Sequence, residues 1–415
     1  MKIKILHISS YDRGGAAVSS MRVHKGLLNA GVDSSFLYGQ GNNCADGSYS
    51  ISRFNNLIHK FGRRISKLKF KYGGYSLKGF YSFLPPHIHI KSQIEKHNPD
   101  LVHLHWVSDL LHPALLSDIK KPIIWSLHDL NPLTGGCHYT SSCNLFQIEC
   151  HACPALGSVR CDDISRYQFL KKANAYKSVK INFVGSSKWI TSTGMSSVLG
   201  GGHCFHHLPT PIDTVAFSPI TKQAARLKLG ISTNKKIILF GADRAMTDPR
   251  KGFHLLLEAL QVFNGDKNQY KMLIVGDDLK SDSIEGFEAH SIGIVKDESL
   301  MHALFCSADL FVAPSVEENL SNMIMESIAC GTPVLAFNIG GNPDMIDHLS
   351  NGYLVNEVSG KALSDGLFNF FGAENLGVDF SGNARKKAVE CFDNSVVIPQ
   401  YLDLYKQILN GRDSA

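Results

Sequence analysis

The sequence predicts an α/β protein of two domains, each with a parallel sheet covered by helices. Short apolar runs, typical of strands buried on both faces, alternate with longer helical patterns in two separate series. Glycine and proline cluster between the two series, from Gly200 to Pro211, as they do at hinges. A chain of 415 residues also suits two domains of ordinary size.

The first series assigns residues 1–210 to an N-terminal, Rossmann-like domain. A helix is expected over residues 16–30, directly after a turn at Gly14 and Gly15. The expected strands are residues 3–8, 34–38, 101–105, 123–127 and 181–184.

The second series assigns residues 211–392 to a C-terminal domain of the same type. Its expected strands are residues 236–241, 272–276, 310–313 and 334–337. The remaining residues, 393–415, predict a closing helix, because apolar side chains recur there at helical spacing.

Composition narrows the class of protein. The chain is 44% hydrophobic and 19% charged, as globular proteins are, and its net charge of +5 is too small to indicate nucleic acid as a partner. It has no run of 18 apolar residues, and the apolar segment at its start is too short for a signal peptide. We therefore expect a cytoplasmic protein.

Two glutamates, Glu318 and Glu326, give the most informative pattern. They follow the apolar run 310–313, one in the expected loop and one on the expected helix, eight residues apart. Ligands of parallel sheets bind at the carboxyl ends of strands, where two carboxylates suit a hydroxyl-rich ligand such as a sugar plus a ribose. A solvated helix start also favours glutamate. The strand before the pair and Gly331-Thr332-Pro333 after the helix favour the binding site.

With Ala329-Cys330-Gly331-Thr332-Pro333-Val334 behind it, this Glu-x7-Glu pattern resembles the donor-binding signature of the group 1 (family 4) retaining glycosyltransferases, which include bacterial exopolysaccharide and colanic-acid types. The resemblance covers nearly the whole chain, best over residues 217–349 and least over 40–100. It implies the GT-B fold, in which two Rossmann-like domains face each other across a cleft and a C-terminal helix crosses back to the first domain.

The resemblance implies a role for each glutamate. Glu318 matches the residue that binds the hydroxyls of the donor sugar, and Glu326 the one that binds the ribose. Many relatives have Gly-Phe-Gly after the first glutamate, so here the donor would meet the backbone of a different run. That run is Asn319, Leu320, Ser321 and Asn322.

Cations are expected at the donor diphosphate, because the leaving group must be neutralised as the glycosidic bond breaks. Arg244 and Lys251 match the pair that clamps the diphosphate in relatives without a metal, so no catalytic metal is expected. The loop between them is longer here than in common relatives, and this makes Arg250 a substitute for Arg244. The simpler interpretation of these residues is ordinary surface charge.

Three features of the first domain complete the expected site. Gly14 and Gly15 could bring backbone amides close to an anion at a helix N-terminus, or could simply form a tight turn. His128, at a strand end, matches a histidine that contacts the donor sugar near the reacting carbon in relatives. His103 and His105 could line the acceptor side or pack in the core.

A cysteine-rich loop spans residues 137–161. The candidate ligands of a structural zinc are Cys137, Cys143, Cys150 and Cys153. A cytosolic protein argues against stable disulfides. Buried free thiols, an iron–sulfur cluster and a redox switch remain open as alternatives.

Six lysines and arginines alternate with apolar residues between His59 and Lys71. This pattern is typical of an amphipathic segment that binds an anionic membrane surface, and equally of a solvated helix face.

These observations together predict a retaining glycosyltransferase that takes a sugar from a nucleotide diphosphate donor. The expected acceptor is a glycan, with a lipid-linked glycan as one form, in surface polysaccharide synthesis. The inner face of the plasma membrane is a candidate location. A sugar-nucleotide 2-epimerase and a non-catalytic sugar-nucleotide-binding protein remain alternatives on the same fold.

Overall fold

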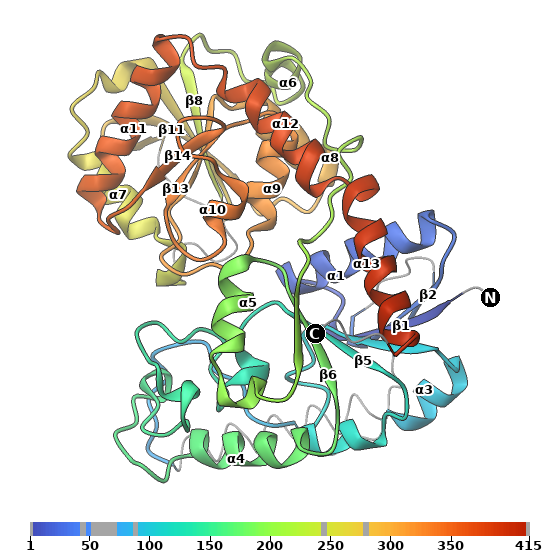
Figure 1. Cartoon of the computed structure of the whole chain (residues 1–415). Coiled ribbons are helices and arrows are strands. Elements are labelled where there is room, and N and C mark those ends of the chain that lie inside the picture. Colours follow the sequence, from blue (N-terminus) through green and yellow to red (C-terminus); the bar gives the residue numbers. More distant parts are fainter. Residues whose placement is uncertain are drawn as a thin grey trace. The chain divides into compact units, whose positions relative to one another are not determined.

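The computed structural model describes residues 3–41, 47–50, 73–85, 90–241, 247–276 and 282–411. The chain divides into two compact units. Unit 1 comprises Met1–Pro211 with Val397–Ala415, and unit 2 comprises Ile212–Val396. Each has one predominantly parallel sheet with helices on both faces (Figure 1). The predicted class, two Rossmann-like α/β domains, is confirmed.

The sheet of unit 1 has seven strands in the order β3-β2-β1-β4-β5-β6-β7, and all neighbours are parallel. Its strands are β1 (Lys4–Tyr11), β2 (Asp33–Gln40), β3 (Ser48–Ser50), β4 (Leu101–Leu104), β5 (Ile123–Leu127), β6 (Ile181–Gly185) and β7 (Cys204–His207). Its helices are α1 (Gly15–Asn29), α3 (Lys91–His97), α4 (Ile164–Tyr176), α5 (Lys188–Met195) and α13 (Asn394–Leu409). The strand order reverses between β1 and β4.

The two faces of this sheet differ in composition because successive side chains of a strand point to opposite faces. One face is apolar and packs against α4 and α5. The other face packs against α1 and α13, and it alternates apolar residues with histidines. Ile5 and Leu101 pack there with Tyr401 and Tyr405 of α13.

The sheet of unit 2 also has seven strands, in the order β10-β11-β9-β8-β12-β13-β14, and only β10 is antiparallel to its neighbour. Its strands are β8 (Lys236–Gly241), β9 (Tyr270–Val275), β10 (Ser283–Ile284), β11 (Phe287–Gly293), β12 (Leu310–Ala313), β13 (Val334–Phe337) and β14 (Gly352–Val355). Its helices are α6 (Lys222–Lys228), α7 (Phe253–Gln261), α8 (Glu298–Ser307), α9 (Asn322–Ala329), α10 (Asn342–Met345), α11 (Gly360–Asn375) and α12 (Phe380–Phe392). Here the order reverses between β8 and β12.

Both faces of the central strands of unit 2 are apolar. Helices α7 and α11 cover one face, and α8, α9 and α12 cover the other (Figure 1). Ile237 and Leu239 of β8 point into one core, whereas Ile238 and Phe240 point into the other. A strand buried on both faces reads as a continuous apolar run, and this is why the sequence predicts β8, β12 and β13 within a residue.

Five short or polar strands were not expected, namely β3, β7, β10, β11 and β14. They lie at or next to the edges of the two sheets, where fewer apolar side chains are needed. The basic segment from His59 to Lys71 falls within residues 51–72, outside the described residues. Among the described helices, none is long and apolar enough to cross a bilayer.

Candidate functional site

The strand order of unit 2 reverses between β8 and β12, and open parallel sheets bind ligands at the carboxyl ends of strands beside such a reversal. Lys251 lies in the loop that follows β8, and Glu318 lies in the loop that follows β12. Lys251 Nζ is 2.9 Å from Glu318 Oε2. The side chains are 25% and 12% exposed, so water screens this ion pair only partly. Two residues of the predicted donor site are thus brought together.

Backbone contacts hold these loops against each other. The Val316 amide donates to the Arg250 carbonyl at 2.8 Å. Gly252 has φ 70°, and a Cβ there would lie 1.7 Å from the carbonyl oxygen of Pro314. Gly340 has φ 54°, and its Cβ would lie 1.8 Å from the carbonyl oxygen of Glu318. Only glycine allows both this conformation and such close approach of backbones.

Of the two arginines predicted to bind the diphosphate, Arg250 lies among the described residues and Arg244 does not. Arg250 Nη2 lies 2.6 Å from Asp248 Oδ2, so much of its charge is balanced inside its own loop. Asp248 also accepts a hydrogen bond from the Arg250 amide, at 3.1 Å, and caps the short helical turn Pro249–Lys251. Arg244 falls within residues 242–246, outside the described residues. Its role stays a prediction.

The remaining donor-site candidates lie at or before the start of α9. Ser321 is the N-cap and accepts a hydrogen bond from the Ile324 amide. Asn319 is buried, whereas Leu320, Asn322 and Glu326 are partly exposed. Because they are four residues apart on α9, Asn322 and Glu326 share one helix face.

The strand order of unit 1 reverses between β1 and β4, and the candidates again follow strand ends near it. Gly14, with φ 88°, precedes α1, and Gly15 is the first residue of that helix. No described atom lies within 4 Å of a Cβ built on Gly14. The turn therefore needs glycine for its backbone conformation and leaves open space beside it.

His128 follows β5 and is partly buried. Its Nε2 lies 3.2 Å from Nδ1 of His105. Burial lowers the pKa of His128 to about 4, although the adjacent Asp129 acts in the opposite direction. The ring is therefore neutral near pH 7, and it can donate or accept a hydrogen bond without carrying charge.

Asp129 is a buried carboxylate that joins three loops, and its sequence pattern did not predict it as a site residue. Its Oδ2 accepts from Trp106 Nε1 at 2.8 Å and lies 2.6 Å from His138 Nδ1, and its Oδ1 accepts from the Asn131 amide at 2.9 Å. Burial alone would raise its pKa, but His138 and these hydrogen bonds outweigh burial and lower it. Its place directly after His128 at a strand end was the available signal.

His103 and His105 are both fully buried on β4 or directly after it. His103 Nδ1 lies 2.8 Å from the Tyr405 hydroxyl, and Nε2 lies 2.8 Å from Ser126 Oγ. Of the two interpretations left open by the sequence, these contacts favour the core role for His103.

Three of the predicted zinc ligands, Cys137, Cys150 and Cys153, are buried, and all four are free thiols. Cys150 Sγ accepts a hydrogen bond from the Gly135 amide at 3.2 Å. A hydrogen bond with Cys153, and burial, raise the pKa of the Cys137 thiol well above its usual value. Zinc at these four residues stays a prediction.

Among the described residues, two triads have ligand atoms within 4.8 Å of one another, namely His7-His103-His105 and His302-Cys306-Cys330, and neither includes a predicted zinc ligand. In the first triad, both ring nitrogens of His103 and of His105 already take part in hydrogen bonds. In the second, His302 Nε2 lies 2.6 Å from the Ser218 carbonyl oxygen. These hydrogen bonds would have to break before either triad could hold an ion.

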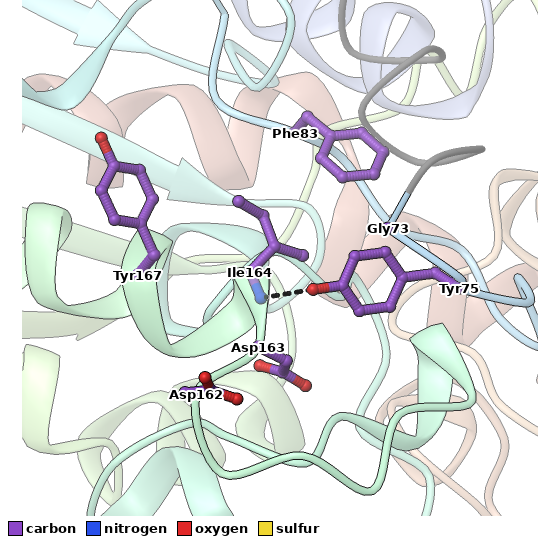
Figure 2. A pocket seen from close by; sticks show the side chains of 7 residues that line it. All are labelled: Gly73, Tyr75, Phe83, Asp162, Asp163, Ile164 and Tyr167. Carbon is purple, nitrogen blue, oxygen red and sulfur yellow. Dashed lines mark hydrogen bonds between the residues drawn. The ribbon is translucent and has the colours of Figure 1, made fainter.

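Figure 2 shows a pocket beside the cysteine-rich loop. It is lined by Gly73, Tyr75, Phe83, Asp162, Asp163, Ile164 and Tyr167. The Tyr75 hydroxyl accepts a hydrogen bond from the Ile164 amide at 3.1 Å, and Asp163 accepts one from the Cys153 amide at 2.9 Å. None of the residues predicted for donor binding lines this pocket.

Known proteins resemble part of this chain in sequence. Residues 221–387 match the family model described as glycosyl transferases group 1. The D-inositol 3-phosphate glycosyltransferase of Segniliparus rotundus is 30% identical over 159 residues, which are 36% of this chain and 35% of that protein. A GDP-mannose-dependent mannosyltransferase of Corynebacterium glutamicum that acts on a monoacylated phosphatidylinositol monomannoside is 28% identical over 166 residues, 36% of this chain and 42% of that protein. The matches thus span well under half the length of these relatives.

Solved structures resemble the whole chain. Sucrose-phosphate synthase from Thermosynechococcus elongatus has a TM-score of 0.69 at 17% identity, with 99% of this chain and 100% of that one covered. Anabaena HepE in complex with UDP-glucose has a TM-score of 0.65 at 17% identity, with 98% and 100% covered. The chain therefore has the fold of the GT-B glycosyltransferases, and most of its second unit matches the model of the glycosyl transferases group 1 family.

Proposed function

We propose that the chain is a glycosyltransferase that moves a sugar from a nucleotide diphosphate donor to a glycan acceptor. The observation that carries this proposal is the Lys251–Glu318 pair, 2.9 Å apart at the carboxyl ends of β8 and β12. A cation for a leaving phosphate and a carboxylate for sugar hydroxyls stand side by side, where ligands of such sheets bind. The donor class is supported by HepE, which was solved with UDP-glucose.

Lys251 acts on the bond that breaks. Its ammonium has three donors and can bind a phosphate oxygen while it keeps Glu318 in place. As the bond from the sugar to the diphosphate breaks, negative charge grows on the leaving oxygens, and a cation already held nearby stabilises that charge. No metal is needed for this step, so we expect turnover in buffer without any added divalent metal ion.

The other site residues bind and orient the donor. Glu318 accepts hydrogen bonds from hydroxyls of the transferred sugar, and Glu326 from those of the ribose. His128, neutral near pH 7, contacts the sugar through a ring nitrogen. The reaction retains configuration at the anomeric carbon by same-face substitution, which the departing diphosphate assists; this follows from the family resemblance.

The test is a thermal-shift screen of nucleotide sugars, because a ligand that binds only the folded state raises its stability with concentration. Lys251→Ala should reduce, but not abolish, the shift given by the best donor, because the bound diphosphate loses one cation. Lys271→Ala is the matched control. Lys271 Nζ lies 2.7 Å from Glu288 Oε1 in the same sheet, but both residues lie near the N-terminal ends of their strands, away from the carboxyl ends that carry Lys251 and Glu318. Equal loss of binding in both variants would contradict the proposal, and donor turnover without an acceptor would indicate an epimerase.

A structural zinc held by Cys137, Cys143, Cys150 and Cys153 is part of the proposal. Thiolates bind zinc strongly, and such a site would hold the cysteine-rich loop together. Protein purified without added metal should contain close to one zinc per chain. Cys150→Ser should lose the zinc, whereas Cys391→Ser, a partly buried thiol of unit 2, should keep it. Background metal content in native protein would leave the cysteines as buried thiols.

The last part of the proposed function is that the chain associates with an anionic membrane surface. This part rests on the sequence between His59 and Lys71. Each Lys or Arg near an anionic leaflet contributes roughly 1 kcal/mol, weakened by salt. The mannosyltransferase of Corynebacterium glutamicum, with its phosphatidylinositol substrate, supports a lipid-linked acceptor. Sedimentation with anionic vesicles, but not neutral ones, should therefore fall when Arg63, Arg64 and Lys67 are replaced by glutamine. Vesicle binding that depends on neither lipid charge nor salt concentration would contradict membrane association through this segment.

A further inference from the structure

We propose that His7 and His105 are positioning residues that set the tautomer and the ring orientation of His128. The three rings form a chain of hydrogen bonds, here called the histidine relay. His128 Nε2 lies 3.2 Å from His105 Nδ1, and His105 Nε2 lies 2.9 Å from His7 Nδ1. The role of His128 at the donor sugar rests on the proposed function; the relay itself does not.

The relay lies inside unit 1. His7 is on β1, His105 follows β4 and His128 follows β5. The histidine relay therefore crosses from β1 to β4, where the strand order reverses. His7 and His105 are 0% and 1% exposed. Their rings are stacked with centroids 5.2 Å apart, and Phe36 stacks on His7 from β2. Packing therefore fixes both inner rings.

All three rings are neutral near pH 7. Burial and the neighbouring histidines lower the pKa of His7 and of His105 well below the usual value, and burial lowers that of His128 to about 4. A neutral imidazole carries one N–H and one bare nitrogen. Each hydrogen bond of the relay therefore fixes which nitrogen of the next ring carries hydrogen.

Only two arrangements satisfy both hydrogen bonds. In the first, His7 donates from Nδ1 to His105, and His105 donates from Nδ1 to His128, so that Nδ1 carries the hydrogen of His128. In the second, every donor is reversed and the last hydrogen sits on His7 Nε2. That nitrogen is buried and has no hydrogen-bond partner among the described residues. A buried N–H without an acceptor is rare, and we therefore infer the first arrangement.

His103 provides a matched comparison. It lies two residues from His105 on the same sheet face, is equally buried and also makes two side-chain hydrogen bonds, but to Tyr405 and Ser126. Its ring stacks on that of His105 with centroids 4.2 Å apart. Replacing either histidine by phenylalanine removes two hydrogen bonds and retains a ring, but only the His105 variant loses a bond to His128.

The experiment is nitrogen NMR of full-length protein labelled with ¹⁵N-histidine, in which ring shifts distinguish N–H from bare nitrogen. His128→Phe identifies the signals of His128. In the native protein, His128 should carry its hydrogen on Nδ1 alone. His105→Phe should produce a mixture of tautomers, His7→Phe a smaller change in the same direction, and His103→Phe no change. Loss of the relay should also lower kcat at least about tenfold, because a misplaced proton weakens hydrogen bonding to the reacting groups.

The outcomes separate the relay from the proposed function. An unchanged His128 tautomer in His105→Phe, or an equal change in His103→Phe, overturns the relay. If His105→Phe does not fold, His7→Phe decides, and an unchanged tautomer there overturns it as well. Absence of sugar transfer by the native protein would refute the proposed function, while the NMR result would still decide the relay.

Discussion

Units 1 and 2 have sheets of the same kind, with the strand order reversing beside the first strand of each, yet they hold their candidate groups differently. In unit 2 the central strands are apolar on both faces, and the charged pair Lys251–Glu318 lies on the loops that follow β8 and β12. In unit 1 the polar groups continue into the sheet, where His7, His103 and His105 are buried. The site of unit 2 is thus separate from its core, whereas that of unit 1 is part of its core.

This difference decides what a change at each site should do. Removing a partly exposed charge from a loop alters ligand binding and leaves the apolar core intact. Changing a buried neutral histidine alters both the site and the free energy of unfolding, because its partners lose hydrogen bonds in a place that water does not reach.

The largest expected effect is acid instability of unit 1. Four histidines, His7, His103, His105 and His128, have a lower pKa in the folded chain than in the unfolded one, at about 3 for His103 and about 4 for His128. Below about pH 6.5 the unfolded chain therefore binds more protons, and stability falls as pH decreases. Four protons correspond to at most about 5 kcal/mol per pH unit.

The tryptophans allow this to be measured in one unit. Trp106, Trp125 and Trp189 are the three tryptophans of the chain, and all lie in unit 1. Tryptophan fluorescence reports unfolding of unit 1, whereas far-UV circular dichroism reports both units. From pH 7 to pH 5, the urea midpoint measured by fluorescence should fall by more than the midpoint measured by circular dichroism. If the two unfolding curves coincide at both pH values, unit 1 is not less stable to acid than unit 2.

The second effect concerns the charged pair of unit 2. Lys251→Ala should raise the barrier of the chemical step by roughly 2 to 4 kcal/mol, about 30- to 1,000-fold in kcat, because the leaving diphosphate loses a cation held in place. Unfolding by urea should be nearly unchanged. Single-turnover kinetics measure the step, with Lys271→Ala as control. A native rate in Lys251→Ala would exclude this lysine from the site.

The third effect compares glycines of the two units. Gly252→Ala should cost about 3 kcal/mol of stability, because its Cβ would lie 1.7 Å from the Pro314 carbonyl oxygen and φ is 70°. Gly14→Ala should cost only about 2 kcal/mol, because φ 88° with ψ 169° is a conformation that essentially only glycine adopts, but its surroundings are open. Urea unfolding of both variants tests this, and equal costs would show that the loops of unit 2 are not closely packed.

The smallest effect separates the two glutamates. Glu326→Ala should raise the Kd of the donor about tenfold, as expected for hydrogen bonds to a spectator ribose, with kcat nearly unchanged. Glu318→Ala should chiefly lower kcat, because we propose that Glu318 binds the sugar that reacts. Calorimetric titration and steady-state kinetics give the two quantities. Small and equal changes in both variants would contradict the assignment.

Sequence patterns were sufficient for the buried strands and for several site candidates. Strands β8, β12 and β13 contain continuous apolar runs, and β5 has one that only Ser126 interrupts; such runs report burial directly. Glu318, Lys251 and His128 were identified by the resemblance to group 1 glycosyltransferases, in the segments that follow such runs. The edge strands, such as β7 with its Cys-Phe-His-His sequence, lack this signal because they bury fewer side chains.

Which of these side chains meet was decided by the tertiary structure alone. Lys251 and Glu318 are 67 residues apart, His7 and His105 are 98 apart, and His103 and Tyr405 are 302 apart. Local periodicity gives the face on which a side chain lies, but strand order and helix packing determine its neighbour across that face. For the same reason the sequence left His103 and His105 between two roles: their burial could be read from the strand, whereas their partners come from β1, β5 and α13.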